Sequence, residues 1–501
     1  MDELRLELTA GPPAEPPLNG HALPGPQFDL GPGDLSEVDW ETTRYLAAAA
    51  QLDPVYARQV VRRIIGEPFR AVAPAAGADV VIVTRWALAA LRRQAKRDAV
   101  LAFLLLLGVI AVFVFWTWLV LAALAVPAIL VVAYERWVRD EKVLARLMLR
   151  GRFRARDTPI SPSPRIEKRL AAVKEQQRGN LVVFRAHSAF VGSGKNMIHD
   201  RVLVHVALGK RKKNGKRQQP TPFTNPELHA ALEAALKEMG FPELRVGERL
   251  YVNGQHVAAE PLLLPDPLAP PIAFAPFRLL YNGCDHPTPD ARTYMCAEIG
   301  GWKGQLVVSL FARAVQARGS LQVEWSFQVL PPLRKHFLEI DSRYELPRAR
   351  QVVNALIAGV AGFAPSLISS PVRLARYLRM PLDDRRRLKK QSYAIRNGLV
   401  FDYGSERSIR EDALGSERLH YFLAQDELTF ILLAEHTMFR ALSNFLHAHN
   451  VDMEQFEAQE KTFINNVSKY NINEVKAQNV SVGNKSRVDN SKKSNDSGSG
   501  K

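Results

Sequence analysis

One uncharged run constrains this chain more than any other feature of its sequence. From Ala99 to Tyr134, 36 consecutive residues carry no ionisable side chain apart from the Tyr134 phenol. A run of about 18 or more such residues is typical of a transmembrane segment, because helices satisfy their own backbone groups in hydrocarbon. One helix of this length would measure about 54 Å, whereas the hydrocarbon core is about 30 Å thick. We therefore expect two spans.

The middle and the flanks of the run favour a hairpin. Trp116 and Trp118 divide it, and tryptophans are enriched at membrane–water interfaces. The cations that flank the run are Arg92, Arg93, Lys96 and Arg97 before it, and Arg136 and Arg139 after it. Short basic flanks stay in the cytoplasm. We therefore predict a transmembrane hairpin over 98–135, in a multi-pass protein of the cytoplasmic (inner) membrane with both termini in the cytoplasm.

The charge of the chain supports a membrane partner. The formal net charge is +16, while residues 1–34 form an acidic arm rich in Pro and Gly that we expect to be disordered. Arg385, Arg386 and Arg387 follow a second apolar stretch and suit anionic head groups. The expected partners are thus the lipid bilayer and its anionic head groups. Nucleic acid is an alternative, but the basic loop 210–217 has no interleaved aromatic residue for base stacking.

The rest of the chain predicts an α+β region. The predicted units are a small helical segment over 35–97, a basic juxtamembrane helix and hinge over 136–164, a cytoplasmic α+β domain with antiparallel strands over 165–345, a mainly helical region over 346–460 and a tail over 461–501. Within them we expect a short strand over 79–85, a hairpin turning at Asn253-Gly254, and strands over 294–299, 305–314 and 321–330. The fold class is therefore a membrane protein with a two-helix hairpin and a cytoplasmic α+β region.

A second apolar stretch leaves three interpretations open. Residues 352–369 carry no charge, but they include Asn354, Pro365 and serines. The stretch is consistent with a third membrane span, with an amphipathic helix on the bilayer surface, or with a core helix.

The Gly192-Ser193-Gly194-Lys195 sequence invites comparison with a phosphate-binding loop. That loop requires a Gly where this chain has Ala189, and a Ser or Thr where it has Asn196. The residues that follow read as a strand, so no helix N-terminus would face a phosphate. We predict a tight turn between strands.

Cys284 and His286 are the candidate catalytic residues, as part of a thiol and imidazole group completed by Cys296. A cysteine nucleophile needs a partner His, which a single sequence does not identify. Structural zinc normally has four ligands, and a fourth is not evident here. A loop with incidental cysteines is the alternative, and we expect no metal and no cofactor.

The tail alternates small apolar residues with Asn and Gly. Its most regular part contains Val480, Val482, Gly483 and Asn484, and such segments stack between chains as steric zippers. This part resembles the core of RIP-homotypic and related amyloid-signalling motifs, with Ser481 where those prefer Gln. The resemblance implies self-association or a protein partner bound through the tail. A disordered tail is the alternative.

The chain as a whole resembles uncharacterised hairpin-anchored membrane proteins of high-GC Gram-positive bacteria. The resemblance rests on the hairpin, on the turn at 189–194 and on the Val-Gly-Asn step of the tail. It implies no assigned activity. We therefore predict a membrane-anchored, non-enzymatic scaffold or signalling/effector protein with a self-associating or recruiting tail, in a stress or anti-phage response. The alternatives are a membrane-tethered enzyme that uses Cys284 and a basic nucleic-acid-binding protein.

Overall fold

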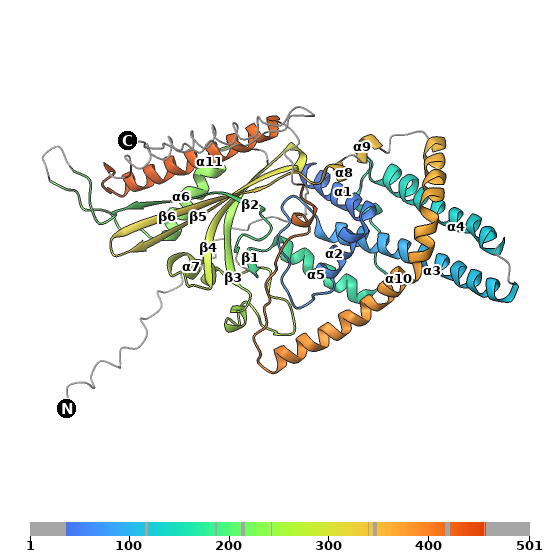
Figure 1. Ribbon diagram of the computed structural model, residues 1–501. Coiled ribbons are helices and arrows are strands. Elements are labelled where there is room, and N and C mark those ends of the chain that lie inside the picture. Colours follow the sequence, from blue (N-terminus) through green and yellow to red (C-terminus); the bar gives the residue numbers. More distant parts are fainter. Residues whose placement is uncertain are drawn as a thin grey trace, which may run out of the picture.

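The computed structural model joins a mixed sheet to a group of helices (Figure 1). It describes residues 37–456 except 116–118, 186–187, 212–215, 242, 339, 344–347, 416–420 and 455. The predicted arm over 1–34 and the tail over 461–501 lie outside the described residues, as do Trp116 and Trp118. The α+β class that the sequence predicts is confirmed.

The sheet has six strands in the order β1-β3-β4-β5-β6-β2. The strands are β1 (Leu181–Phe184), β2 (Lys195–Val204), β3 (Leu244–Asn253), β4 (Ala291–Gly301), β5 (Leu306–Ala317) and β6 (Ser320–Leu330). The last three form the predicted antiparallel series, and Arg318 and Gly319 make the turn between β5 and β6 with positive φ angles of 49° and 79°. The prediction of antiparallel strands is too simple, because β1 pairs in parallel with β3.

Helices α6 (Asn225–Lys237), α7 (Phe277–Asp285) and α11 (Tyr421–Ala448) belong to the sheet half. The long α11 lies along one face of the sheet, together with α6 (Figure 1). Thr224 begins α6 with a capping box. Its side chain accepts a hydrogen bond from the Glu227 backbone N–H, and the Glu227 carboxylate accepts one from the Thr224 backbone N–H. Trp325, Phe327 and Phe439 are buried in the core between the two layers. The remaining short elements are η2 (Ala155–Asp157), η3 (Val257–Ala259), η4 (Trp302–Gly304) and η5 (Glu411–Ala413).

The helical half surrounds a second core. Its elements are α1 (Glu37–Leu52), α2 (Pro54–Ile64), α3 (Val80–Phe115), α4 (Leu119–Trp137), the π-helical η1 (Val138–Ala145), α5 (Pro164–Arg178), α8 (Lys335–Leu338), α9 (Ile340–Arg343) and α10 (Arg348–Arg396). This core collects residues far apart in sequence, from Leu46 in α1 to Phe337 in α8 and Ala413 in η5. The C-terminal part of the chain therefore completes both cores: Ile409 and Ala413 pack in the helical half, and α11 packs in the sheet half.

The predicted strand over 79–85 is wrong, because these residues begin α3. The β-branched run Val80-Val81-Ile82-Val83 favours a strand by composition. The Asp79 carboxylate, however, accepts hydrogen bonds from the backbone N–H groups of Val81 and Ile82, at 2.8 and 3.0 Å. This N-cap, together with burial of the run against α1 and α2, selects the helix.

The predicted hairpin about Asn253-Gly254 is also wrong. Gly254 directly follows β3 and contacts a distant loop: a Cβ on it would lie 2.3 Å from the Gly404 nitrogen. The Gly254 N–H donates to the Phe184 carbonyl, and its own carbonyl accepts from the Tyr403 N–H, each at 2.9 Å. The glycine is required for close backbone approach rather than for a turn.

Helix α10 contains 49 residues and three internal prolines. Pro371 has no N–H, so the Leu367 carbonyl one turn earlier loses its usual donor. The Ser370 hydroxyl donates to that carbonyl at 2.7 Å, and the Arg373 guanidinium donates to the Ser366 carbonyl at 2.8 Å. These bonds let the helix continue through the proline. By length and composition, Ala349–Arg396 passes as a membrane-crossing helix, the one such helix among the described residues, and it is mostly exposed.

Candidate functional site

The Gly192-Ser193-Gly194 turn already holds an anion from its own chain. One Glu411 carboxylate oxygen accepts from the backbone N–H groups of Gly192 and Gly194, at 3.1 and 3.2 Å. The other accepts from the Ser408 N–H at 2.8 Å. Successive N–H groups of this kind form an anion-binding nest. The predicted turn is present, but it does not join neighbouring strands, because ten residues separate β1 from β2 and the two strands lie at opposite edges of the sheet. Its N–H groups bind Glu411 and so fasten the 401–411 loop to the start of β2.

Cys284 is placed beside a histidine that the sequence did not identify. Its sulfur lies 3.3 Å from Nδ1 of His229 on α6, and this nitrogen lies 3.1 Å from Glu248 on β3. All three side chains face the layer between the sheet and its helices, whereas His286 is exposed. Burial raises the pKa of the Cys284 thiol, and the Glu248 and Asp285 carboxylates raise it further. The thiol is thus held in its unreactive form.

The same three residues, His229, Glu248 and Cys284, have the composition of a metal site. The hydrogen bonds of the imidazole, however, do not suit metal binding. The Ala314 backbone N–H donates to Nε2 of His229 at 3.2 Å. Nε2 therefore keeps its lone pair, and Nδ1 carries the proton of the neutral ring. A metal on Nδ1 would require a proton on Nε2, directly against the Ala314 N–H. The cluster fits a buried hydrogen-bond network that fills the gap where β4 and β5 separate.

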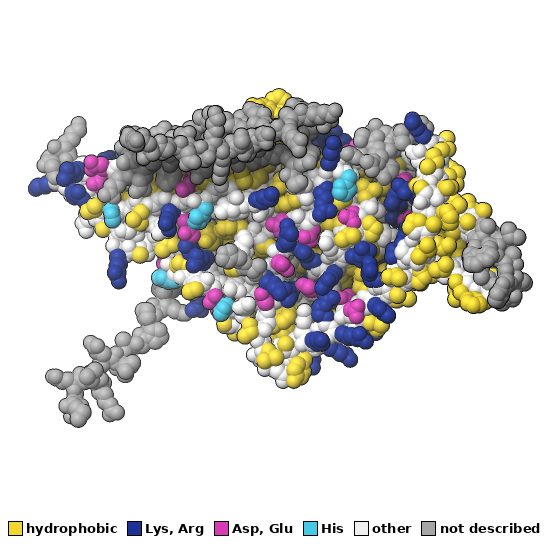
Figure 2. Space-filling model, in the orientation of Figure 1, with side chains coloured by type: hydrophobic (Ala, Val, Ile, Leu, Met, Phe, Trp, Pro, Cys, Tyr) yellow, Lys and Arg dark blue, Asp and Glu magenta, His cyan; other side chains and the backbone are white. Residues whose placement is uncertain are grey.

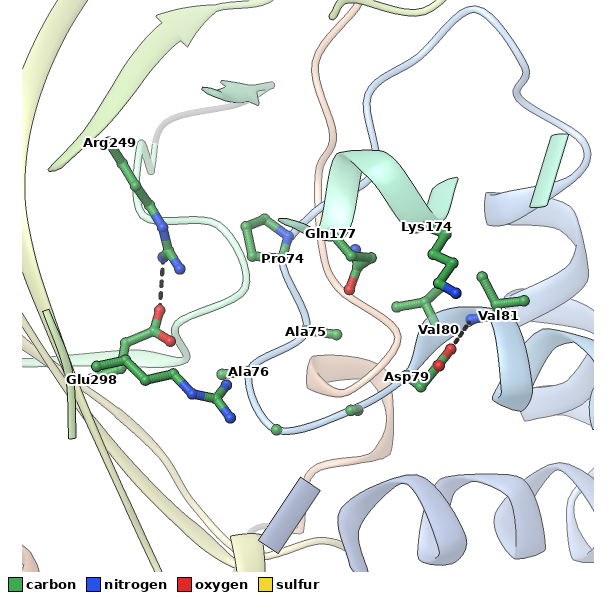
Figure 3. A pocket seen from close by; sticks show the side chains of 13 residues that line it. Pro74, Ala75, Ala76, Asp79, Val80, Val81, Lys174, Gln177, Arg249 and Glu298 are labelled. Carbon is green, nitrogen blue, oxygen red and sulfur yellow. Dashed lines mark hydrogen bonds and ion pairs between the residues drawn. The ribbon is translucent and has the colours of Figure 1, made fainter. Parts of the chain in front are cut away.

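A small cavity separates the sheet from the loop that precedes α3 (Figure 3). On the sheet side, the buried Arg249 and Glu298 form an ion pair at 2.7 Å. On the other side, Asp79 caps α3. The cavity measures about 30 Å³, enough for about two water molecules. It is therefore part of the packing between the two halves rather than a substrate site.

A larger cleft is lined by arginines. It measures about 300 Å³ and lies between α2, the end of β1 and the 401–411 loop. Its lining includes Arg62, Arg63, Arg70, Arg185 and Arg407, with Glu67 and Glu406 as its acids. Burial lowers the pKa of Arg70, and the neighbouring Arg185 lowers it further. We call this the arginine cleft. Three of its arginines form ion pairs, Arg63 with Asp412, Arg70 with Glu67 and Arg185 with Asp402, and the positive charge of the others suits an anionic ligand.

At the other end of the molecule, apolar side chains face outward (Figure 2). Phe113 of α3 is 77% exposed and Ile368 of α10 is 71% exposed. We name this the apolar helix surface; its exposed members are Phe103, Leu106, Val109, Ile110, Phe113, Val126, Leu130, Leu356, Ile357, Val360, Ile368 and Val372. Large contiguous apolar surfaces are rare on soluble monomers and mark protein or membrane contacts.

The helices that carry this surface are held together at their base by paired charges. Arg93 and Arg97 of α3 reach Glu135 of α4 at 3.0 and 3.3 Å, so the two helices run antiparallel. The Arg373 guanidinium of α10 donates to both oxygens of the buried Asp98, at 2.9 Å each. We call these five residues the charge layer. Arg93, Arg97 and Asp98 precede the uncharged run, which starts at Ala99, and Glu135 directly follows it.

Helix α10 crosses α3 and α4 just beyond the charge layer (Figure 1). Phe363 and Leu367 pack with Leu101 and Ala128. A Cβ on Gly359 would lie 2.9 Å from the Ala133 Cβ, so the glycine permits a close approach of α10 to α4. The three helices form one cluster.

The predicted interface cations fall into two groups. Arg93, Arg97, Arg139 and Arg387 form ion pairs within the protein, and Arg92 donates to the Ser161 hydroxyl at 3.0 Å. The exposed members are Lys96, Arg385, Arg386 and Arg136, the last of which also lies 3.9 Å from Asp140. The tail residues Val480, Val482, Gly483 and Asn484 lie outside the described residues. Sequence analysis missed Asp98, Glu135 and Arg373 as partners, because their contacts join distant segments.

Comparison with known protein families returns one match. A family model described as an AbeC-like domain matches residues 202–482, which is more than half of the chain. The matched region starts in β2 and includes the rest of the sheet apart from β1, together with α10 and α11. No curated protein and no solved structure matches the chain.

Proposed function

Since the chain belongs to the AbeC-like domain family, whose model includes α10, we propose that it is a membrane-anchored, non-enzymatic scaffold or effector protein. The observation that carries this proposal is the apolar helix surface above the charge layer. Water would destabilise so many exposed Leu, Ile, Val and Phe side chains, whereas lipid would solvate them. The polar half of the molecule would then stand at the bilayer surface.

The connections of the helices support a hairpin with both ends on one side of the membrane. Arg93 before the uncharged run and Glu135 after it form an ion pair, so the two ends of the run lie together. Both ends join the same folded body through Trp86 on one side and Leu144 on the other. Short basic flanks favour a cytoplasmic location for this body. Residues 98–135 would thus cross the membrane twice.

For α10, the connections favour a helix in the plane of the membrane. Phe337 precedes α10 and Ile409 follows it, and both lie in the same core cluster. The chain therefore leaves this core and returns to it on the same side. The first part of α10 runs across the hairpin helices rather than alongside them (Figure 1). An interfacial helix with its apolar face in lipid accounts for both observations.

Two observations support a non-enzymatic role over an enzyme that uses Cys284. The Cys284 thiol is buried with its pKa raised, and its histidine partner is committed to Glu248 and Ala314. The turn at Gly192-Ser193-Gly194, which resembles a phosphate-binding loop, is occupied by the Glu411 carboxylate.

The tail is proposed as the element that self-associates or recruits a partner, and its separate test is self-association of the isolated peptide 461–501.

The anchoring proposal is tested by inserting charge into the hairpin. We expect the full chain to remain in membranes after carbonate extraction, and Leu106→Lys with Ile110→Lys to release it or to prevent its insertion. The matched control is Ala230→Lys with Ala234→Lys, an exposed pair at the same spacing on α6. Release of the control and retention of the hairpin variant would contradict membrane anchoring.

The topology is tested by cysteine labelling, since both native cysteines are buried. Thr117→Cys, in the middle of the uncharged run, should react with a membrane-impermeant maleimide in intact cells. Ile160→Cys, at an exposed position of the cytoplasmic body, should react only after permeabilisation. Protection of position 117 in intact cells and reaction after permeabilisation would overturn the crossing.

The arginine cleft favours a second candidate function, reception of a soluble anionic ligand by the anchored protein. Five arginines against two glutamates line a space of ligand size. Isothermal titration of the purified full chain with pyrophosphate as the probe tests it. Binding that Arg185→Gln weakens, and that added salt weakens further, would support this function. Heat changes no larger than those of a buffer blank would remove it.

A further inference from the structure

A second arginine-lined pocket lies at the base of the apolar helix surface, between α2, α3 and α10. It measures about 210 Å³, and its apolar wall is formed by Val55, Leu91 and Met380. Its cations are Arg58, Arg97, Arg373 and Arg376. The pocket also includes Asp98, the last charged residue before the uncharged run. We call it the interfacial pocket, because it lies at the level where α3 leaves the polar body.

The acids near this pocket are already engaged. Asp98 accepts from both Arg97 and Arg373. Asp53, the acid that acts on Arg58, caps α2 through the Val55 and Tyr56 N–H groups and lies 3.7 Å from Arg334. Among the described residues, no carboxylate forms an ion pair with either Arg58 or Arg376.

Arg58 and Arg376 therefore act on each other across the pocket. Burial lowers the pKa of Arg58, and the charge of Arg376 lowers it further. Arg58 comes from α2 and Arg376 from α10, so the folded core holds the two like charges together. An anion between them would remove the repulsion and accept hydrogen bonds from both guanidinium groups.

We propose that the interfacial pocket binds the phosphate group of an anionic phospholipid, with the phosphate between Arg58 and Arg376. The lipid source follows from the apolar wall and from the position of the pocket beside Val372, an exposed member of the apolar helix surface. A free phosphate has no apolar part that could pack against that wall. This inference rests on the proposed membrane anchoring and adds a lipid preference to it.

The experiment uses the full chain in a neutral detergent. Short-chain phosphatidylglycerol, short-chain phosphatidylcholine and inorganic phosphate are titrated separately, and binding is followed by the rise in the thermal unfolding midpoint. We expect phosphatidylglycerol to bind at least tenfold more tightly than either of the others. Equal binding of inorganic phosphate would overturn the lipid source, and equal binding of phosphatidylcholine would overturn recognition of the anion.

The variant is Arg58→Gln with Arg376→Gln, which should weaken phosphatidylglycerol binding about tenfold or more. The matched control, Arg201→Gln with Arg440→Gln, removes two exposed arginines from the sheet half, outside the pocket, and should bind as the original chain does. If the double variant fails to fold, Arg376→Gln alone, at an exposed position, is the substitute. Equal losses in the variant and the control would overturn the site.

Carbonate extraction of the same variants separates the two proposals. If the Arg58 and Arg376 variant stays in membranes but binds phosphatidylglycerol as tightly as the original chain, the pocket proposal fails and anchoring stands. If the original chain is itself extracted, the proposed function fails first.

Discussion

The sheet half and the hairpin end of this molecule use similar apolar residues in opposite ways. In the sheet half, Phe327 is fully buried between β6 and α11, whereas at the hairpin end Phe113 is 77% exposed. Charged side chains show the opposite pattern at the hairpin end, where Asp98 and Glu135 are buried at the base of the hairpin. With the proposed anchoring, the chain would meet two solvents, water around the sheet half and lipid around the helix cluster.

The sharpest way to break this comparison is to truncate the same residue type in both regions. Phe327→Ala should lower the free energy of unfolding by about 4 kcal/mol, because it leaves a cavity in a packed core. Phe113→Ala should change it little in detergent. Thermal unfolding of the two variants measures the difference, and similar losses for both would contradict the two-solvent interpretation.

The charge layer gives the next largest effect. Asp98→Asn should destabilise the detergent-solubilised protein by about 3 kcal/mol, because Arg97 and Arg373 would keep their charges without their common carboxylate. Asp383→Asn, an exposed carboxylate on α10, is the control and should be nearly neutral. Equal midpoints for the two variants would show that the layer does not hold α10 against α3.

A buried carboxyl group in the sheet half makes the free energy of unfolding depend on pH. Burial raises the pKa of Glu435 on α11 to about 7, aided by Asp200 and opposed by a hydrogen bond from Trp325. The native state therefore keeps a proton that the unfolded state releases near pH 4.5, so stability falls as the pH rises from about 4.5 to 7. Glu435→Gln should gain about 2 to 3 kcal/mol relative to the original chain at pH 8, and almost nothing at pH 4.5.

Unfolding midpoints at the two pH values check this expectation. Glu454→Gln, at an exposed position, serves as the control and should follow the original chain at both. A gain for Glu435→Gln that is the same at pH 4.5 and pH 8 would show that the carboxyl does not titrate in this range.

The smallest effect concerns the Glu411 nest. Glu411→Gln should cost about 1 to 2 kcal/mol, since an amide has one acceptor oxygen in place of two charged ones. Glu406→Gln, exposed on the same loop, should be neutral. Limited proteolysis near residues 401–411 provides the measurement, and unchanged cleavage in Glu411→Gln would mean that the nest does not fasten the loop.

Local patterns predicted the elements whose neighbours are close in sequence. The strands β4, β5 and β6 follow from alternation and from the Arg318-Gly319 turn. The errors at Asp79 and Gly254 arose where a distant segment decided the outcome. Asp79 caps a helix that packs against α1, and Gly254 meets the loop at Gly404. Composition alone carries no information about such contacts.

In the candidate site, too, local features can be seen in the sequence, whereas contacts between distant segments cannot. Basic flanks around the uncharged run are visible in the sequence, but their partners are not: Asp98 and Arg373 lie far apart along the chain. His229 beside Cys284 is likewise a product of the fold. The opposition of Arg58 and Arg376 depends on α2 and α10 meeting at one pocket, which no spacing along the chain indicates.

The route of the chain through the helical core sets the order of events during synthesis. That core needs Phe337, Ile340, Ile409 and Ala413, yet the hairpin segment ends near residue 135. If the hairpin anchors the protein as proposed, the whole anchor would leave the ribosome some two hundred residues before the core that supports it can close. Insertion would then come first, and the N-terminal helices would stay at the bilayer surface until the C-terminal segment is synthesised. A chain truncated before Phe337 would leave an inserted anchor joined to an unfinished core.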